Sequence, residues 1–182
     1  MLPMSHPDHF ALFAMPARFA LDEAELERAH KDVQSKVHPD RFASGSAAER
    51  RVAMQWAARA NEAYRTLKSP LARAAFLCER AGVPIDANTN TSMPVEFLAQ
   101  QMEWREALDE ARADGDASRF AALTSEINEV HGRLIVELES ALDVRGDYPG
   151  ASGLVRRLMF VDKFRDELRA AVEAQSAPKA SA

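Results

Sequence analysis

The sequence predicts an all-α protein, and three observations support this fold class. The chain of 182 residues has only seven glycines, and alanine, which costs least to order in a helix, is abundant. No segment alternates apolar and polar residues as a half-buried strand does. Apolar residues instead recur at intervals of three and four, in segments that follow residues suited to cap a helix N-terminus. The apolar fraction of 47% is enough for a packed core and argues against bulk disorder.

Two long helices joined by a loop are predicted in the N-terminal half. The first begins at Asp22, with Glu25 at capping-box spacing, and ends near Val37 because Pro39 disfavours helical geometry before it. The second begins after Ser46, with a glutamate again three residues on. Its predicted buried stripe consists of Ala53, Trp56, Ala57, Ala60, Tyr64 and Leu67. We therefore expect an antiparallel helical hairpin.

A shorter helix is predicted on each side of the hairpin. Residues 10–14 form the first, with a proline close behind to stop it. The other begins at Pro70, where Ser69 supplies the cap, and runs to about Arg80. Residues 83–92 contain a proline and a polar run, which indicates a linker.

Three further helices are predicted beyond the linker, over about 94–113, 116–143 and 150–174. Tight turns of Gly, Asp and Pro separate them, so an antiparallel three-helix bundle is expected over 93–174. Residues 175–182 are small and polar and are expected to form a disordered tail.

Composition and charge exclude several classes of protein. No apolar run is long enough to cross a membrane. The single cysteine, Cys78, cannot form an internal disulfide or a paired-cysteine zinc site, which indicates a reducing compartment. The net charge of −5 is a poor match for nucleic acid. The acidic excess lies in residues 83–182, which suggests two modules with different partners.

The search for catalytic or metal-binding residues yields little. The chain has no glycine-rich phosphate loop and no nucleophile elbow, and Cys78 lies inside a helix, where a structural role is expected. His6 and His9 have metal-compatible spacing but no acidic or thiol partner at useful spacing. His30 falls on the buried stripe of its helix, and His131 is expected on the bundle surface. We expect no catalytic residue, no metal site and no cofactor.

The tripeptide His38-Pro39-Asp40, between the two long helices, is the most informative motif. Pro39 fixes one backbone torsion, so its neighbours lose less entropy on docking. Asp40 can accept a bidentate hydrogen bond from an arginine of another protein. Taken alone, the tripeptide is equally compatible with a docking tip and with an ordinary helix C-terminus, where basic residues offset the helix dipole.

In its context the tripeptide resembles the signature of a J-domain, the helical-hairpin module of the DnaJ family. The resemblance narrows to the HscB (Hsc20/Jac-type) co-chaperones of iron–sulfur cluster assembly and covers about residues 8–172. The blocks that carry it are HPDRFA (38–43), NEAYRTL (61–67), SPLARA (69–74), FLAQQMEWREALDE (97–110) and RLMFVDK (157–163).

The resemblance implies a J-domain at 8–82 that binds a specialised, HscA-like Hsp70 chaperone and stimulates its ATPase. The residues expected to contact the chaperone are His38, Pro39, Asp40, Arg41, Arg28, Lys31 and Lys36. It also implies that the bundle binds an IscU-like scaffold protein and that the two modules form an L. The residues expected to contact the scaffold are Leu98, Ala99, Met102, Glu103, Glu106, Glu110 and Phe160. Those expected to dock the modules are Leu71, Phe76, Leu77 and Val83.

The positions of the expected scaffold-contacting residues around their helices can be tested by helical geometry alone, independently of the family resemblance. When Phe97 and Trp104 mark the centre of the buried stripe, Leu98 and Met102 lie about 100–140° away. The three glutamates continue around the same side, and Phe160 lies about 120° from the core residues of its own helix. Large apolar residues off the core stripe favour a binding patch. The alternative is a wide core stripe beside a solvated charge run.

Two residues depart from the family pattern. Ala99 is smaller than the methionine associated with its position, so less contact area is expected there. Trp104 replaces an aliphatic residue, on the core stripe. The chain also lacks the N-terminal cysteine pair of some eukaryotic relatives, which favours a bacterial-type protein.

We therefore expect a non-enzymatic co-chaperone in the cytoplasm that binds neither nucleic acid nor membrane. Three alternatives remain open: a general J-domain co-chaperone with another client, a helical adaptor without a chaperone role, and a small metalloenzyme.

Overall fold

The computed structural model describes residues 8–37, 45–85 and 93–176. Within these ranges every regular element is helical, as the composition predicts. The elements in order are α1 (His9–Leu12), α2 (Glu23–Val37), α3 (Ala47–Lys68), α4 (Pro70–Arg80), α5 (Val95–Asp114), α6 (Ala117–Glu139), the π-helical turn η3 (Ser140–Arg145) and α7 (Tyr148–Ser176).

The helices begin at the capping residues that the sequence indicates. Ser46 accepts a hydrogen bond from the Glu49 N–H, and the Glu49 carboxylate accepts one from the Ser46 N–H, so the capping box is complete. The Asp22 carboxylate accepts a hydrogen bond from the Glu25 N–H at the start of α2. Ser69 caps α4 in the same way.

Three helix ends differ from the sequence expectation. The first helix ends at Leu12, and Ala14 has a positive φ of 54° that breaks the helical path before the proline is reached. The helix expected over 116–143 changes to a π-helix at Ser140. The last helix continues to Ser176, so the start of the expected disordered tail is helical.

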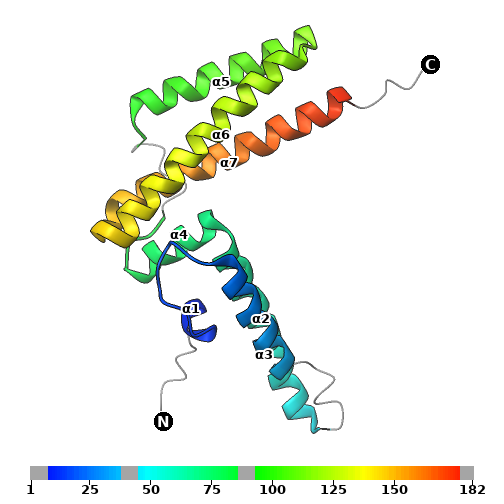
Figure 1. The fold of residues 1–182 in the computed structure, drawn as a ribbon, viewed down its shortest axis with the longest axis vertical. Coiled ribbons are helices and arrows are strands. Elements are labelled where there is room, and N and C mark those ends of the chain that lie inside the picture. The colour runs from blue at the N-terminus through cyan, green and yellow to red at the C-terminus, as the bar shows by residue number, and fades with distance from the viewer. Residues whose placement is uncertain (1–7, 38–44, 86–92, 177–182) are drawn as a thin grey trace, which may run out of the picture.

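In the hairpin, α2 and α3 run antiparallel and pack side by side (Figure 1). Leu26 of α2 is buried, and α3 buries three alanines, small side chains that allow the two backbones to approach. Trp56, Ala57 and Tyr64 are half-buried instead of buried, while Ala53, Ala60 and Leu67 are buried as predicted.

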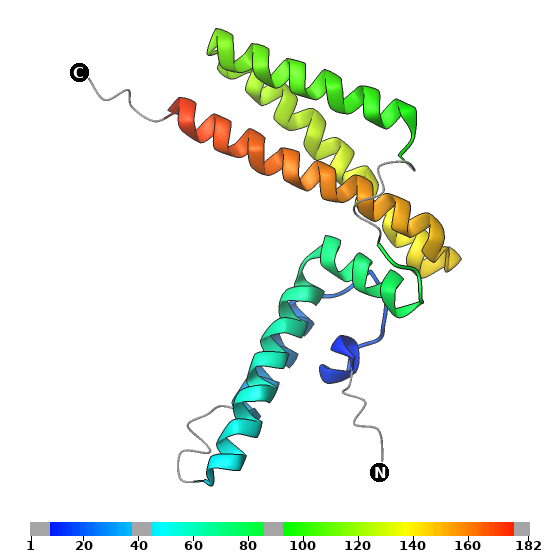
Figure 2. The ribbon, with the colours of Figure 1, turned by 180° about the vertical axis from the view of Figure 1, so that it is seen from behind.

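The C-terminal half is a three-helix bundle in which α6 packs against both α5 and α7 (Figure 2). The apolar positions predicted for α6 form its buried face. They are Phe120, Leu123, Ile127, Val130, Leu134 and Leu138. Across from them, α7 buries a matching row that includes Leu154, Leu158, Val161 and Leu168.

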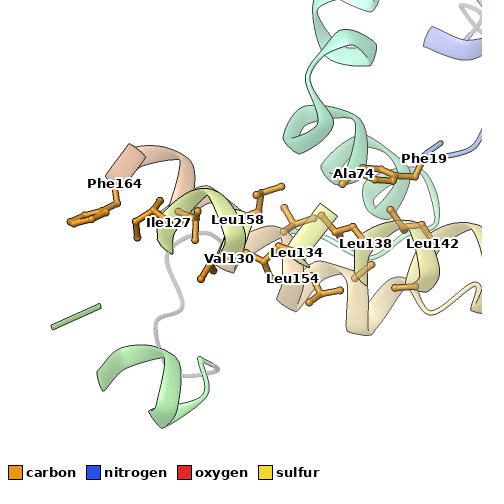
Figure 3. Close-up of a cluster of buried hydrophobic side chains, with 14 of the residues drawn as sticks. Phe19, Ala74, Ile127, Val130, Leu134, Leu138, Leu142, Leu154, Leu158 and Phe164 are labelled. Atoms are coloured by element: carbon orange, nitrogen blue, oxygen red, sulfur yellow. The ribbon is translucent and has the colours of Figure 1, made fainter. Parts of the chain in front are cut away.

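The hairpin and the bundle meet where α4 packs against α7, and the two arms form an L (Figures 1 and 2). One buried apolar cluster continues across this junction, and Figure 3 shows Phe19 and Ala74 in the cluster that also holds Leu138 and Leu142. Leu77 is buried in the same cluster. The three other residues expected to dock the modules pack against it while partly buried: Leu71, Phe76 and Val83.

Candidate protein-binding surfaces

The expected chaperone-binding tripeptide and Arg41 lie in residues 38–44, outside the described residues. The structure places the flanks of this segment. The C-terminal end of α2, at Val37, and the N-terminal end of α3, at Ala47, both lie at the far end of the hairpin arm (Figure 1).

The three basic candidates on α2 are exposed but differ in their partners. Lys31 Nζ lies 2.8 Å from the Glu27 carboxylate, whose hydrogen bond raises the pKa of Lys31. Lys36 Nζ lies 2.6 Å from the carboxylate of Asp32. Across the described ranges, Arg28 forms no ion pair. Arg28 is therefore the candidate whose charge is most available to a partner.

His30 fastens α2 to α3. Its ring stacks on Tyr64 with ring centroids 4.2 Å apart, and its Nε2 lies 3.1 Å from Oδ1 of Asn61. Gln34 donates a second hydrogen bond to the same oxygen. His30 thus has its hydrogen-bonding and packing partners within the protein, at the edge of the core. Two residues of the block 61–67, Asn61 and Tyr64, supply these contacts and so help to pack the hairpin.

The expected scaffold-contacting residues of α5 all point away from the core. Trp104 is only 2% exposed, whereas Met102 is 65% exposed. The remaining members of the set on α5 are also exposed: Leu98, Ala99, Glu103, Glu106 and Glu110. Rotation around the helix, worked out from sequence alone, therefore separates the two faces correctly.

Val95 belongs to the same face of α5 and was missed by the sequence reasoning. It is 75% exposed and stands three residues before Leu98 and seven before Met102, a spacing that places all three on one side of the helix. This spacing is the signal that could have identified it. We call Val95, Leu98 and Met102 the α5 apolar strip.

The three glutamates beside the strip are not equivalent. Glu110 Oε2 accepts a hydrogen bond of 2.8 Å from Arg119 of α6. Glu103 and Glu106 take part in no ion pair among the parts of the chain that the structure describes. Two carboxylates are thus free to meet a basic partner, and the third shares the guanidinium of Arg119 with Asp114 and Asp116.

Phe160 of α7 is half-buried against aromatic rings of α5. Its ring centroid lies 5.9 Å from that of Phe97 and 6.4 Å from that of Trp104. Part of the ring remains accessible, so Phe160 can both pack inward and contact a partner.

The described residues contain neither an exposed thiol nor a group of side chains suited to a metal ion. Cys78 is buried, its thiol lies 3.7 Å from the carbonyl oxygen of Tyr148, and burial raises its pKa to about 11. In the ranges 8–37, 45–85 and 93–176, His, Cys, Asp and Glu form no group of three or more suited to a metal ion. No helix in those ranges is both long and apolar enough to cross a membrane.

Comparison with known proteins supplies the family. A protein of Bordetella parapertussis described as a co-chaperone protein HscB homolog is 56% identical over 168 residues, which cover 92% of this chain and 98% of the relative. The chain belongs to the HscB co-chaperone family. The family model described as the HSCB C-terminal oligomerisation domain matches residues 93–169, the stretch that forms the bundle.

Solved HscB structures share this fold. The chaperone HscB of Vibrio cholerae aligns with a TM-score of 0.81 at 31% identity, covering 94% of this chain and all of that protein. The human HscB co-chaperone aligns with a TM-score of 0.86 at 25% identity, covering 93% of this chain and 84% of the human one. In this HscB-family chain, the two candidate surfaces occupy separate arms, α2 in the hairpin and α5 in the bundle (Figures 1 and 2).

Proposed function

We propose that this HscB-family protein stimulates the ATPase of an HscA-like Hsp70 chaperone and delivers an IscU-like scaffold protein to it during iron–sulfur protein maturation. The J-domain, residues 8–82, acts on the chaperone, and the bundle, residues 93–174, holds the scaffold. The protein works in the cytoplasm without a catalytic residue, metal or cofactor of its own. The observation that supports this most directly is the α5 apolar strip, which is exposed beside free carboxylates on a well-packed bundle.

On the chaperone arm, the proposed contacts are the tripeptide 38–40, Arg41 and the basic residues of α2. Arg28 supplies a charge without an ion-pair partner among the described residues, whereas Lys31 and Lys36 share their charges with Glu27 and Asp32. Charges at the rim of an interface mainly steer association and orientation. We therefore assign recognition geometry to the tripeptide and steering to Arg28.

On the scaffold arm, the α5 apolar strip forms the centre of the contact and Glu103 and Glu106 form its charged edge. An apolar centre within a polar rim is the usual anatomy of a protein interface. Phe160 adds an aromatic anchor, the residue type that commonly dominates binding energy. Glu110 contributes less, because its carboxylate already accepts a hydrogen bond from Arg119.

The two arms act together through linkage. A J-domain that favours the ATP-hydrolysing state of the chaperone also favours its grip on the client, and the client favours hydrolysis in return. The continuous apolar cluster at the junction holds the arms in one arrangement, so the scaffold is presented from a fixed direction. A fixed arrangement lowers the entropic cost of forming the three-protein complex.

The test is a steady-state ATPase assay with the chaperone alone, with this protein, and with this protein plus the scaffold. We expect stimulation by this protein and further stimulation when the scaffold is added. Stimulation without any scaffold effect or scaffold binding would point to a J-domain co-chaperone with another client. Absence of stimulation by folded protein would overturn the chaperone assignment and leave a helical adaptor.

A further inference from the structure

Four aromatic rings from two helices form a ladder behind the candidate scaffold surface. Trp104 stacks on Phe160 and on Phe164, with centroid separations of 6.4 and 5.8 Å and interplanar angles of 16° and 26°. Phe97 meets the Phe160 ring edge-on, at 83°. Three members of the ladder are buried, and only Phe160 reaches the surface.

Trp104 also forms a hydrogen bond to α6, the one helix of the bundle that contributes no ring to the ladder. Its indole N–H donates a hydrogen bond of 2.7 Å to Oε1 of Glu126 on α6. A buried indole N–H needs a partner, and a carboxylate is a stronger acceptor than a neutral group. Glu126 is exposed, so its carboxylate stays in contact with water while it accepts this bond. The Trp104 ring is thus held in both position and rotation.

Trp104 forms part of the surface on which Phe160 rests, together with Phe97 and with Phe164, whose ring stacks on Phe160 with centroids 6.2 Å apart. Offset stacking and edge-on contacts are directional, so a ring that packs against Trp104 and Phe97 loses alternative rotamers. A side chain that is already ordered binds with a smaller entropic penalty than a mobile one. The benefit reaches a partner through Phe160 alone, because Trp104 and Phe97 are covered.

We propose that Trp104, oriented by Glu126, is a positioning residue that holds the Phe160 ring ready for the scaffold protein. The proposal rests on the proposed scaffold-binding role of the bundle and adds residues that touch no partner themselves. It predicts that Glu126, which lies on a different helix from the α5 apolar strip, affects scaffold affinity through Phe160.

The test compares Glu126→Ala with Glu129→Ala in the full-length protein. Both variants remove one exposed carboxylate from α6, but the Glu129 side chain forms no hydrogen bond or ion pair with any described residue, whereas the Glu126 side chain accepts the hydrogen bond of Trp104. By calorimetric titration of the scaffold, we expect Glu126→Ala to weaken binding about two- to tenfold, the range for one ordered side chain, and Glu129→Ala to leave it unchanged. Trp104→Phe, which keeps a ring without the N–H, should behave like Glu126→Ala.

Two further measurements separate positioning from a general structural effect. In the Phe160→Ala background, Glu126→Ala should cause no additional loss of affinity, because the ring it acts through is absent. Without any scaffold, NMR of the labelled phenylalanines should show that the Phe160 ring-proton shifts change in Glu126→Ala and stay constant in Glu129→Ala.

Four outcomes would overturn the proposal. Glu126→Ala could bind the scaffold like the wild type while Phe160→Ala binds weakly, which would leave the proposed function intact. Glu126→Ala could weaken binding equally in both backgrounds, or leave the Phe160 shifts unchanged. If the wild-type protein itself failed to bind the scaffold, the proposed function would fail together with the positioning role.

Discussion

The carboxylate of Asp143, in η3, accepts a hydrogen bond of 2.6 Å from the backbone N–H of Phe19. Its second oxygen accepts one of 2.7 Å from Ala20. The guanidinium of buried Arg73, on α4, lies 5.1 Å from the centroid of the Phe19 ring. The segment between α1 and α2 is thus held from both sides where the two arms of the L meet.

Removal of this carboxylate should loosen the junction. In Asp143→Ala, two backbone N–H groups lose a charged acceptor, and we expect a loss of about 1–3 kcal/mol in the free energy of unfolding. Urea denaturation followed by circular dichroism measures it. Glu139→Ala, an exposed carboxylate one residue before η3, serves as the control and should stay within about 0.5 kcal/mol of the wild type. Equal stability of the two variants would mean that Asp143 does not secure the junction.

The basic residues of α2 should differ in their effect on the chaperone. Arg28→Ala is expected to lower the apparent affinity for the chaperone more than Lys36→Ala, by about threefold or more, because the charge of Lys36 is already offset by Asp32. Chaperone titrations in the ATPase assay give the apparent affinity of each variant.

The tripeptide can be tested through its aspartate. Asp40→Asn should abolish ATPase stimulation, measured in the same assay, while the circular dichroism spectrum stays unchanged. Full stimulation by Asp40→Asn would remove the tripeptide from the interface.

The α5 apolar strip should carry much of the scaffold affinity. We expect Leu98→Ala and Met102→Ala each to weaken scaffold binding about tenfold, since each removes an exposed apolar side chain at the centre of the interface. Val136→Ala truncates an exposed apolar residue of α6 outside the strip and should bind normally. Calorimetric titration distinguishes these outcomes, and equal losses in all three variants would argue against a localised site.

The carboxylates beside the strip should rank by their internal pairing. Glu103→Ala is expected to weaken scaffold binding more than Glu110→Ala, because Glu110 is already bound to Arg119. The difference should shrink at high salt, which screens exposed charges. Surface plasmon resonance at two ionic strengths measures both effects. A larger loss for Glu110→Ala would contradict the ranking.

Stability should fall in mild acid because of His131. Burial and nearby Arg165 lower the pKa of His131 below its usual 6.5, despite Asp162 at 3.3 Å. His131 therefore binds a proton more readily in the unfolded chain than in the folded protein. The free energy of unfolding is accordingly highest above pH 6.5 and decreases as the pH falls toward the lowered pKa of the folded state. Urea midpoints between pH 7.5 and 5.5 should decline less in His131→Asn than in the wild type. An identical decline would exclude His131 as a source.

The positions of the helices could be predicted because their signals are local. Capping pairs such as Ser46 and Glu49 lie three residues apart, and Pro39 restricts only its immediate neighbour. The exposed face of α5 could be predicted for the same reason, since the angle between Trp104 and Met102 depends only on helical geometry. The exact ends of α1 and α7 and the start of η3 were harder to predict from the sequence, because packing against other helices decides where a helix changes or stops.

The amino-acid sequence by itself determined the all-α class, the two-module order and the side of α5 that faces outward, since these depend on neighbours along the chain. Only the tertiary structure decided that Asp143 accepts a hydrogen bond from Phe19, that Arg119 pairs with Glu110, and that Glu126 accepts the hydrogen bond of Trp104. Each of these pairs joins different elements. Such contacts depend on how helices cross and on side-chain rotamers at the crossing, which no periodicity within a single helix encodes.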